Sequence, residues 1–210
     1  MRSIITGWHW RRLDTVMTYG EIKRAVLEQI NQRSIAGELV ADDYNNQSDY
    51  VSRIPNLITQ AVTHIRTSVC PERNVFPVEQ NGQKWEAVRL PSDCRRIVTG
   101  GIREVTDSGP RATNNYHLLG DRQIWFPPGE YLVEYEVYPR QLPAAPVDAY
   151  DFMEEPEVLQ AAIYYAAAHL VRMDDAFSYQ ALYNEYQERL AALVPAPSAE
   201  IVPIEDVYGF

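Results

Sequence analysis

Apolar side chains recur with a helical period near the start of this chain. Thr18 followed by Glu21 forms a capping box ahead of an apolar stripe, which predicts a helix over residues 18–32. A broader stripe predicts a second helix over residues 52–69. Pro55 would lie in the first turn of this helix, where the missing backbone N–H costs little; if the helix begins earlier, Pro55 would kink it.

The helical period returns in the last third of the chain. Pro156 opens a wide stripe that is rich in alanine, which predicts a helix over residues 156–172. A further stripe predicts a helix over residues 175–193, beginning near Asp175. Because the link between them is short, we expect these two helices to pack as an antiparallel pair.

Between the two helical regions, over residues 84–139, the hydrophobic period changes to two. Short β-branched and aromatic runs alternate with turn residues, which predicts four or five antiparallel strands. Gly100 and Gly101 interrupt one of these runs, and we expect a bulge or bend there. The last strand should have one buried and one mixed face, since Tyr131, Val133, Tyr135 and Val137 alternate in it with Leu132, Glu134, Glu136 and Tyr138.

These patterns predict an α+β fold. We expect mainly a helical bundle of two helical hairpins, with a small antiparallel β-sheet inserted between them. The chain has 210 residues and a hydrophobic content of 46%, which is enough for one compact domain. We assign residues 17–194 to this domain, residues 1–16 to an N-terminal arm and residues 195–210 to an extended C-terminal tail.

The N-terminal arm is locally basic and aromatic. Its residues Trp8, Trp10, Arg11 and Arg12 make it a candidate for docking elsewhere in an assembly. The alternative is a frayed end, or a strand that packs on its own domain.

The C-terminal tail cannot continue the last helix, because Pro195 and Pro197 stop that helix. We interpret the tail as an extended peptide that adds to a neighbouring sheet or fills the grooves of a partner. The alternative is that it folds back over its own core. Its candidate partner-binding residues are Ile201, Val202, Ile204, Val207, Tyr208 and Phe210.

The chain is acidic, with a formal net charge of −10. Lys and Arg supply most of the binding energy for phosphates, so this charge argues against a protein that wraps nucleic acid. It leaves open an acidic pore through which DNA slides. No run approaches the roughly 18 apolar residues of a membrane span. The N-terminus lacks a secretory signal pattern, so we expect synthesis in a reducing, intracellular compartment.

The residues that carry chemistry form no recognisable catalytic or metal site. Cys70 and Cys94 are too isolated for a zinc site or a disulfide framework. Acidic residues gather at predicted helix starts or in loops, where capping and the helix dipole favour them without catalysis. No nucleophile elbow or phosphate-binding loop is present, so we expect no enzyme activity, no metal and no cofactor. Metal-pair spacing is also missing among the histidines, which are His9, His64, His117 and His169.

Four aromatic residues of the β-rich region are of a kind that stacks on bases in single-strand binders. These residues lack the basic neighbours that such a role needs, so we interpret them as packing residues. They are Trp85, Trp125, Phe126 and Tyr138.

Five stretches carry a resemblance: MTYGEIKRAVLEQI, IPNLITQAVTHIRT, LPSDCRRIV, GEYLVEYEVYPRQLP and the closing hairpin around YYAAAHLVRMDD. Over residues 17–193 their order resembles the head-to-tail adaptor (connector) proteins of tailed bacteriophages. Such adaptors form a ring, commonly a dodecamer, beneath the portal, extend the channel for double-stranded DNA and offer a platform to the next tail component. The resemblance implies a virion protein of the neck, made in the host cytoplasm, whose residues 199–210 engage the portal.

Our leading hypothesis is therefore a non-enzymatic neck adaptor. Two alternatives stay open: a stopper or tail-completion protein of the same neck, and an unrelated small hydrolase with a dispersed site. A ring with a DNA-wide hole separates the first two from the hydrolase. Direct binding to the portal separates the adaptor from the stopper.

Overall fold

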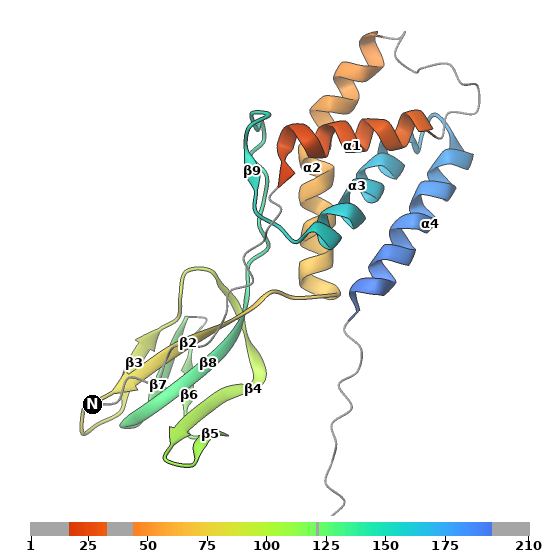
Figure 1. The fold of residues 1–210 in the computed structure, drawn as a ribbon. Helices are drawn as coiled ribbons and strands as arrows, with labels where there is room; N and C mark the ends of the chain where they lie inside the picture. The colour runs from red at the N-terminus through yellow and green to blue at the C-terminus, as the bar shows by residue number, and fades with distance from the viewer. Residues whose placement is uncertain (1–16, 33–43, 121, 195–210) are drawn as a thin grey trace, which may run out of the picture.

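The computed structural model describes residues 17–32, 44–120 and 122–194. In these ranges the chain forms a helical module at one end and a β module at the other (Figure 1). The helices are α1 (Tyr19–Gln32), α2 (Tyr44–Ser68), α3 (Pro156–Val171) and α4 (Ala176–Leu193). The strands are β1 (Met17–Thr18), β2 (Arg73–Gln80), β3 (Glu86–Arg89), β4 (Cys94–Thr106), β5 (Gly109–Ala112), β6 (His117–Leu119), β7 (Gln123–Phe126), β8 (Gly129–Val137) and β9 (Asp151–Phe152).

The prediction of a mainly helical bundle with a small inserted sheet is wrong. The described residues form four helices, but they also form nine strands in three antiparallel sheets. Of the two expected hairpins, the pair of α3 and α4 does pack together, whereas α1 barely touches α2 and both of these helices pack mainly against α3. Periodicity shows which side of a helix is buried, but it does not show which element covers that side.

Small side chains make α3 the centre of the helical module. Its alanines at positions 161, 162, 166, 167 and 168 have no exposed area, and Val158 and Leu159 are equally buried. Alanine allows a neighbouring helix to approach closely, because the distance between helix axes depends on the side chains at the contact. Three helices can therefore surround α3 on different sides.

Local capping starts two of these helices as predicted. The Thr18 N–H donates to Glu21 Oε2 at 2.8 Å, and the Glu21 N–H donates to Thr18 Oγ1 at 3.3 Å, which is a complete capping box. At α4, Asp175 Oδ1 accepts hydrogen bonds from the N–H groups of Phe177 at 2.9 Å and Ser178 at 3.1 Å. Each contact satisfies a backbone donor that a helix start leaves free.

The start of α2 differs from the prediction. The helix begins at Tyr44 rather than at residue 52, so Pro55 lies inside it and not in its first turn. Proline there removes the N–H that would bond to the carbonyl of Val51. The prediction failed because the first turns are polar in sequence, and a search for an apolar stripe does not detect them.

The β module contains two sheets that share one core. Their strand orders are β2-β8-β4-β5 and β3-β7-β6, with antiparallel pairing throughout. The rings of Phe126 and Tyr131 stack with centroids 4.5 Å apart and join the two sheets. Tyr131, Val133 and Tyr135 are all buried, which confirms the predicted buried face of the last strand.

The β region begins earlier than the predicted range of 84–139. β2 starts at Arg73 and contains Pro77. Proline lacks the N–H for a sheet hydrogen bond, so it is tolerated on edge strands. β2 is the edge strand of its sheet, which explains why this strand can form.

The predicted bulge is present in β4. The register between β4 and β8 shifts between Ile97 and Ile102. Gly100 lies inside this break with φ +72°, a left-handed conformation that favours glycine. The bulge lets one long strand bend along its partner.

A short two-stranded sheet connects the start of α1 to the chain that leads into α3. Met17 pairs with Phe152 across β1 and β9. The Tyr19 N–H then donates to the carbonyl of Tyr150 at 2.8 Å, and the Gly20 N–H donates to that of Asp148 at 2.9 Å. Residues far apart in sequence are thus fixed together at one end of α1.

Candidate assembly surfaces

The partner-binding residues expected from sequence all lie outside the residues that the structure describes. Those of the N-terminal arm are Trp8, Trp10, Arg11 and Arg12. Those of the C-terminal tail are Ile201, Val202, Ile204, Val207, Tyr208 and Phe210.

The described histidines make structural contacts. His64 Nδ1 lies 2.9 Å from the hydroxyl oxygen of Tyr186. His169 lies among tyrosine rings of α3 and α4; burial, and then the charges of Arg172 and Arg53, lower its pKa. No group of three or more His, Cys, Asp or Glu side chains in the described ranges is placed to hold a metal ion.

Both cysteines are free thiols in the structure. Cys94 is buried in the core of the β module, and Cys70 is partly buried at the end of α2. Burial is the main reason that the pKa of each thiol is raised. A thiol of this kind is a weak nucleophile and contributes mainly to packing.

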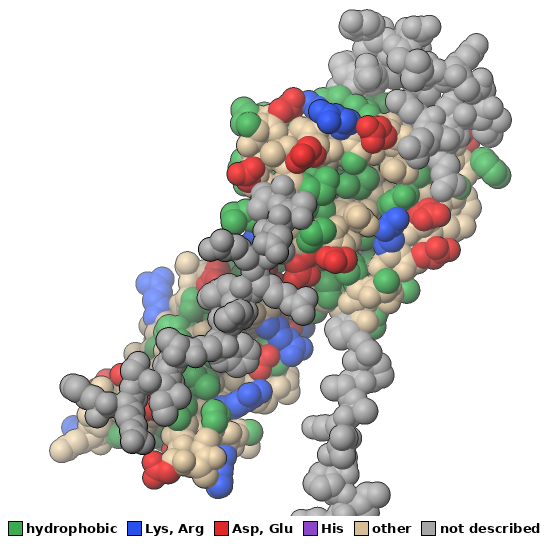
Figure 2. Space-filling model, viewed as in Figure 1, with side chains coloured by type: hydrophobic (Ala, Val, Ile, Leu, Met, Phe, Trp, Pro, Cys, Tyr) green, Lys and Arg blue, Asp and Glu red, His purple; other side chains and the backbone are tan. Residues whose placement is uncertain are grey.

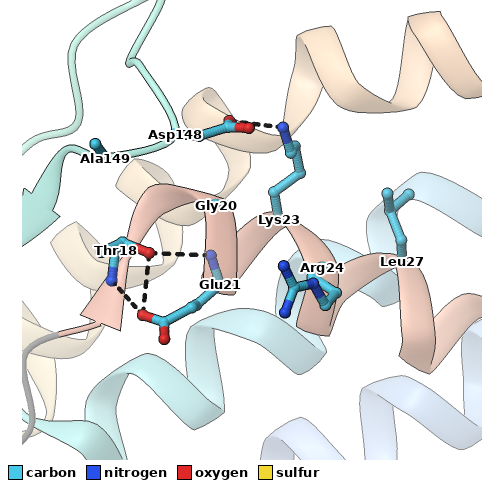
Figure 3. Close-up of a pocket in the computed structure, with 8 residues that line it drawn as sticks. All are labelled: Thr18, Gly20, Glu21, Lys23, Arg24, Leu27, Asp148 and Ala149. Carbon is cyan, nitrogen blue, oxygen red and sulfur yellow. Dashed lines mark hydrogen bonds and ion pairs between the residues drawn. The ribbon is translucent and has the colours of Figure 1, made fainter.

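A surface pocket of about 540 Å³ lies at the start of α1 (Figure 3). Its lining residues are Thr18, Gly20, Glu21, Lys23, Arg24, Leu27, Asp148 and Ala149. The Glu21 carboxylate turns back to Thr18 in the capping box, and Lys23 Nζ lies 2.6 Å from Asp148 Oδ1 (Figure 3). The acidic groups of this pocket are therefore engaged in holding α1 to the chain that leads into α3.

A buried ion pair joins α2 to the start of α3. Arg66 and Glu154 have only 5% and 2% of their side-chain surface exposed, and the Arg66 Nε–H donates to Glu154 Oε1 at 3.2 Å. Arg66 also donates to the carbonyl of Cys70 at 3.1 Å and lies 3.3 Å from Glu155. Burial lowers the pKa of Arg66, but the hydrogen bond and charge of Glu154 outweigh it and raise the pKa overall. The sequence gives no signal for this contact, because 88 residues separate the partners.

A second charged group connects the two modules. Arg95 donates to Glu136 Oε2 at 3.0 Å and to the carbonyl of Thr67 at 3.5 Å. Thr67 belongs to the last turn of α2, whereas Glu136 belongs to β8. Arg95 therefore bridges the β module and the end of a helix, where a cation is favoured by the helix dipole.

The outer face of the four-stranded sheet carries cross-strand ion pairs. Glu134 lies between Arg73 and Arg103, with N–O distances of 3.4 and 3.5 Å. Glu136 accepts two hydrogen bonds from Arg96, at 2.6 and 2.8 Å. Arg73, Arg96 and Arg103 are exposed, as on a sheet face in contact with water, whereas Glu136 is only 4% exposed.

The outer face of the three-stranded sheet has a different character. His117 pairs with Trp125 across β6 and β7, and the imidazole of His117 stacks on Trp85 with centroids 4.9 Å apart. Trp85, Trp125 and Leu119 remain 36%, 38% and 53% exposed. We call these four residues, Trp85, His117, Leu119 and Trp125, the aromatic patch. Large apolar side chains exposed side by side make this patch a candidate interaction surface.

The packing interpretation of the aromatic residues is correct for one residue and wrong for three. Phe126 is fully buried, but Trp85, Trp125 and Tyr138 are exposed. Strand alternation carries the relevant signal, because Ile124 and Phe126 face the core and Trp125 must face the other way. The sequence alone does not show whether another element covers that face, and in the described chain none does.

Charge is distributed unevenly along the chain. Residues 73–137 contain eight Lys and Arg against nine Asp and Glu, whereas residues 138–194 contain three against nine. Figure 2 shows basic side chains over the β module and several acidic ones over the helical module. The helical module therefore carries most of the net negative charge of the described residues.

The comparisons with known proteins agree with the resemblance seen in the sequence. None of the described helices is long and apolar enough to span a membrane. No curated protein matches the chain. The family model described as SU10 adaptor protein matches residues 17–202, which includes both modules and the first part of the C-terminal tail. The chain therefore belongs to the SU10 adaptor protein family, a family of phage head-to-tail adaptors.

Proposed function

We propose that copies of this chain form a ring beneath the portal of a tailed phage. The ring, a dodecamer in our proposal, extends the channel for double-stranded DNA and offers a docking platform to the next neck or tail protein. The observation that carries the proposal is the family match over residues 17–202. Such a family implies contacts with portal and tail proteins in the virion neck, and its role is structural.

The ends of the chain supply the contacts to partners in this proposal. The C-terminal tail binds the portal or a neighbouring subunit through Ile201, Val202, Ile204, Val207, Tyr208 and Phe210. The N-terminal arm docks through Trp8, Trp10, Arg11 and Arg12. Extended segments of this kind bind by adding strands to sheets or by filling grooves, which suits a protein that acts without catalysis.

The negative net charge supports a channel whose lining does not bind DNA. The chain carries a formal charge of −10, and a basic lining would bind phosphates and slow the passage of DNA. The ion pairs on the four-stranded sheet leave few unpaired cations there. DNA therefore passes without sequence-specific binding.

Electron microscopy of the purified full chain, with and without portal protein, tests this function. We expect a ring with a central hole wide enough for a DNA duplex, and a complex of that ring with the portal. A ring that does not bind the portal would favour a stopper or tail-completion protein. A compact monomer that does not assemble under either condition would contradict the proposal and reopen the hydrolase alternative.

A further inference from the structure

The helical module and the β module have separate hydrophobic cores. The core of the helical module contains residues of α1, α2, α3 and α4 together with Leu142 and Phe152, whereas the core of the β module is built from residues 76–137. No described residue belongs to both cores. A turn of one module relative to the other therefore opens neither core, and such motion is the usual expectation for two bodies without a large shared interface.

The first connection between the modules runs from α2 to β2 and narrows to Pro71. On the helical side, the Cys70 N–H still donates to the carbonyl of Ile65 at 3.0 Å. On the other side, the Glu72 carbonyl accepts from the Val137 N–H at 3.0 Å, so Glu72 is already held in the β module. Proline lacks an N–H and leaves its own ψ free, so Pro71 adds no backbone donor to brace this step.

The second connection runs from β8 towards β9 through residues 139–141. The Tyr138 N–H donates to the carbonyl of Asp93 at 2.9 Å, which holds Tyr138 in the β module. The Leu142 N–H donates to Thr59 Oγ1 at 3.1 Å, and Leu142 is buried in the core of the helical module. Three residues therefore span the junction on this side, and Figure 1 shows both connections crossing the waist between the modules.

The two connections are tied to each other. Arg140 Nη2 lies 3.4 Å from Glu72 Oε1, and both side chains are partly exposed. In the described ranges, no backbone hydrogen bond runs from one module to the other. Pro71 and residues 139–141 can therefore act as one hinge, in which a few residues absorb the change of backbone angles.

Arg95 carries a side-chain hydrogen bond across this hinge. Its guanidinium donates to Glu136 Oε2 at 3.0 Å inside the β module and to the carbonyl of Thr67 at 3.5 Å at the end of α2. The second distance is at the long end of the hydrogen-bond range, so this contact is weaker than one of ordinary length. The helix dipole adds a modest attraction for a cation there. Arg95 therefore favours one orientation of the β module without fixing it permanently.

We propose that the β module turns as a rigid body about a hinge at Pro71 and residues 139–141, and that the contact of Arg95 with Thr67 is the latch of this hinge. The inference goes beyond the proposed function and does not require ring assembly. In the ring proposed above, the helical modules can keep their contacts while the β modules turn towards a partner.

Distances between two spin labels in the full chain, measured by pulsed electron paramagnetic resonance, test the hinge. A keto amino acid that carries the label replaces two exposed residues, Gln187 in α4 and Asp107 between β4 and β5, so both cysteines stay native. Labelled copies are diluted with unlabelled copies, so that each distance lies within one chain. Arg95→Met should raise the ratio of other orientations to the main one about three- to tenfold, the effect of losing one charged hydrogen bond at a helix end.

Arg96→Met is the matched control. Arg96 donates to the same Glu136 carboxylate at 2.6 and 2.8 Å, but these bonds lie on the sheet and not across the hinge. This variant should leave the distribution of distances between Gln187 and Asp107 unchanged. A second pair of labels, at Lys84 and Asp107, lies within the β module and should give the same distance in all three proteins.

The outcomes are distinct. A single distance that Arg95→Met leaves unchanged would overturn the inference, because the modules would then form one rigid body. Equal broadening in Arg96→Met would also overturn it, since the change would then originate in the sheet. A changed distance within the β module of Arg95→Met would do the same, because it would show local unfolding and not a turn. Each of these results would leave the proposed ring and its portal contact standing, because neither depends on the hinge.

Discussion

Replacing Arg66 by methionine should lower the free energy of unfolding by about 3–5 kcal/mol, the cost of removing one partner of a buried ion pair. Methionine has a similar length, so the change removes the charge with little loss of volume. Glu154 has 2% of its side chain exposed, and its Oε1 accepts from the Arg66 guanidinium. Its Oε2 already has no hydrogen-bond partner among the described residues.

The variant leaves this carboxylate buried with a single neighbouring donor. The Glu155 N–H, 3.0 Å from Glu154 Oε1, is the contact that remains. The carbonyl of Cys70 also loses its bond from Arg66. Replacing Glu154 by leucine in the same protein should recover most of the loss, because a buried pair exchanged for apolar residues is often neutral.

Urea unfolding followed by circular dichroism measures these differences. Arg53→Met is the matched control, since Arg53 lies 3.6 Å from Asp49 and its side chain is 44% exposed. This surface pair should contribute about 0–1 kcal/mol. A loss for Arg66→Met no larger than that for Arg53→Met would refute the reasoning. So would a double variant less stable than Arg66→Met alone.

Three further predictions concern local structure. Asp175→Ala should lower the thermal midpoint of unfolding. Hydrogen bonds, first from the Ser178 side chain, lower the pKa of Asp175, so the difference in midpoint between wild type and variant should vanish as pH falls through that pKa. Gly100→Ala should lower the free energy of unfolding in urea by about 1–2 kcal/mol, because φ is +72° and an added Cβ meets no neighbour that could offset the strain. An unchanged urea midpoint would contradict this prediction. Burial, and then the charge of Arg172, lower the pKa of His169 in the folded protein. His169 therefore binds a proton more readily in the unfolded chain, and the folded protein loses stability as pH falls below about 6.5. His169→Phe should flatten this dependence between pH 7 and pH 5 in thermal melts.

Helix starts were predictable where a local signal exists. Thr18 with Glu21, and Asp175 alone, mark their helices through side chains that bond to nearby backbone groups. The first turns of α2, which begins at Tyr44, carry no apolar stripe, so nothing in their pattern extends the predicted helix before residue 52. β2 lies outside the predicted β-rich range, and whether its Pro77 is compatible with a strand depends on the strand lying at an edge of the sheet.

The surfaces available to partners were not predictable to the same extent. Alternation predicts that Trp125 and Phe126 face opposite ways, but burial depends on what lies over each face. The core takes Phe126, and nothing in the described chain covers Trp125. The Arg66–Glu154 pair is likewise invisible, because its partners come from different helices.

The helical and strand periods, two helix caps, the acidic character and the resemblance to phage adaptors were all predictable from the sequence, because each depends on neighbouring residues or on composition. Three features required the folded structure: α3 is the shared core of the helices, the strands form three sheets, and one sheet face exposes aromatic side chains. These features depend on contacts between residues far apart in the chain. Local patterns specify which side of an element is apolar, but only packing selects the element that covers it.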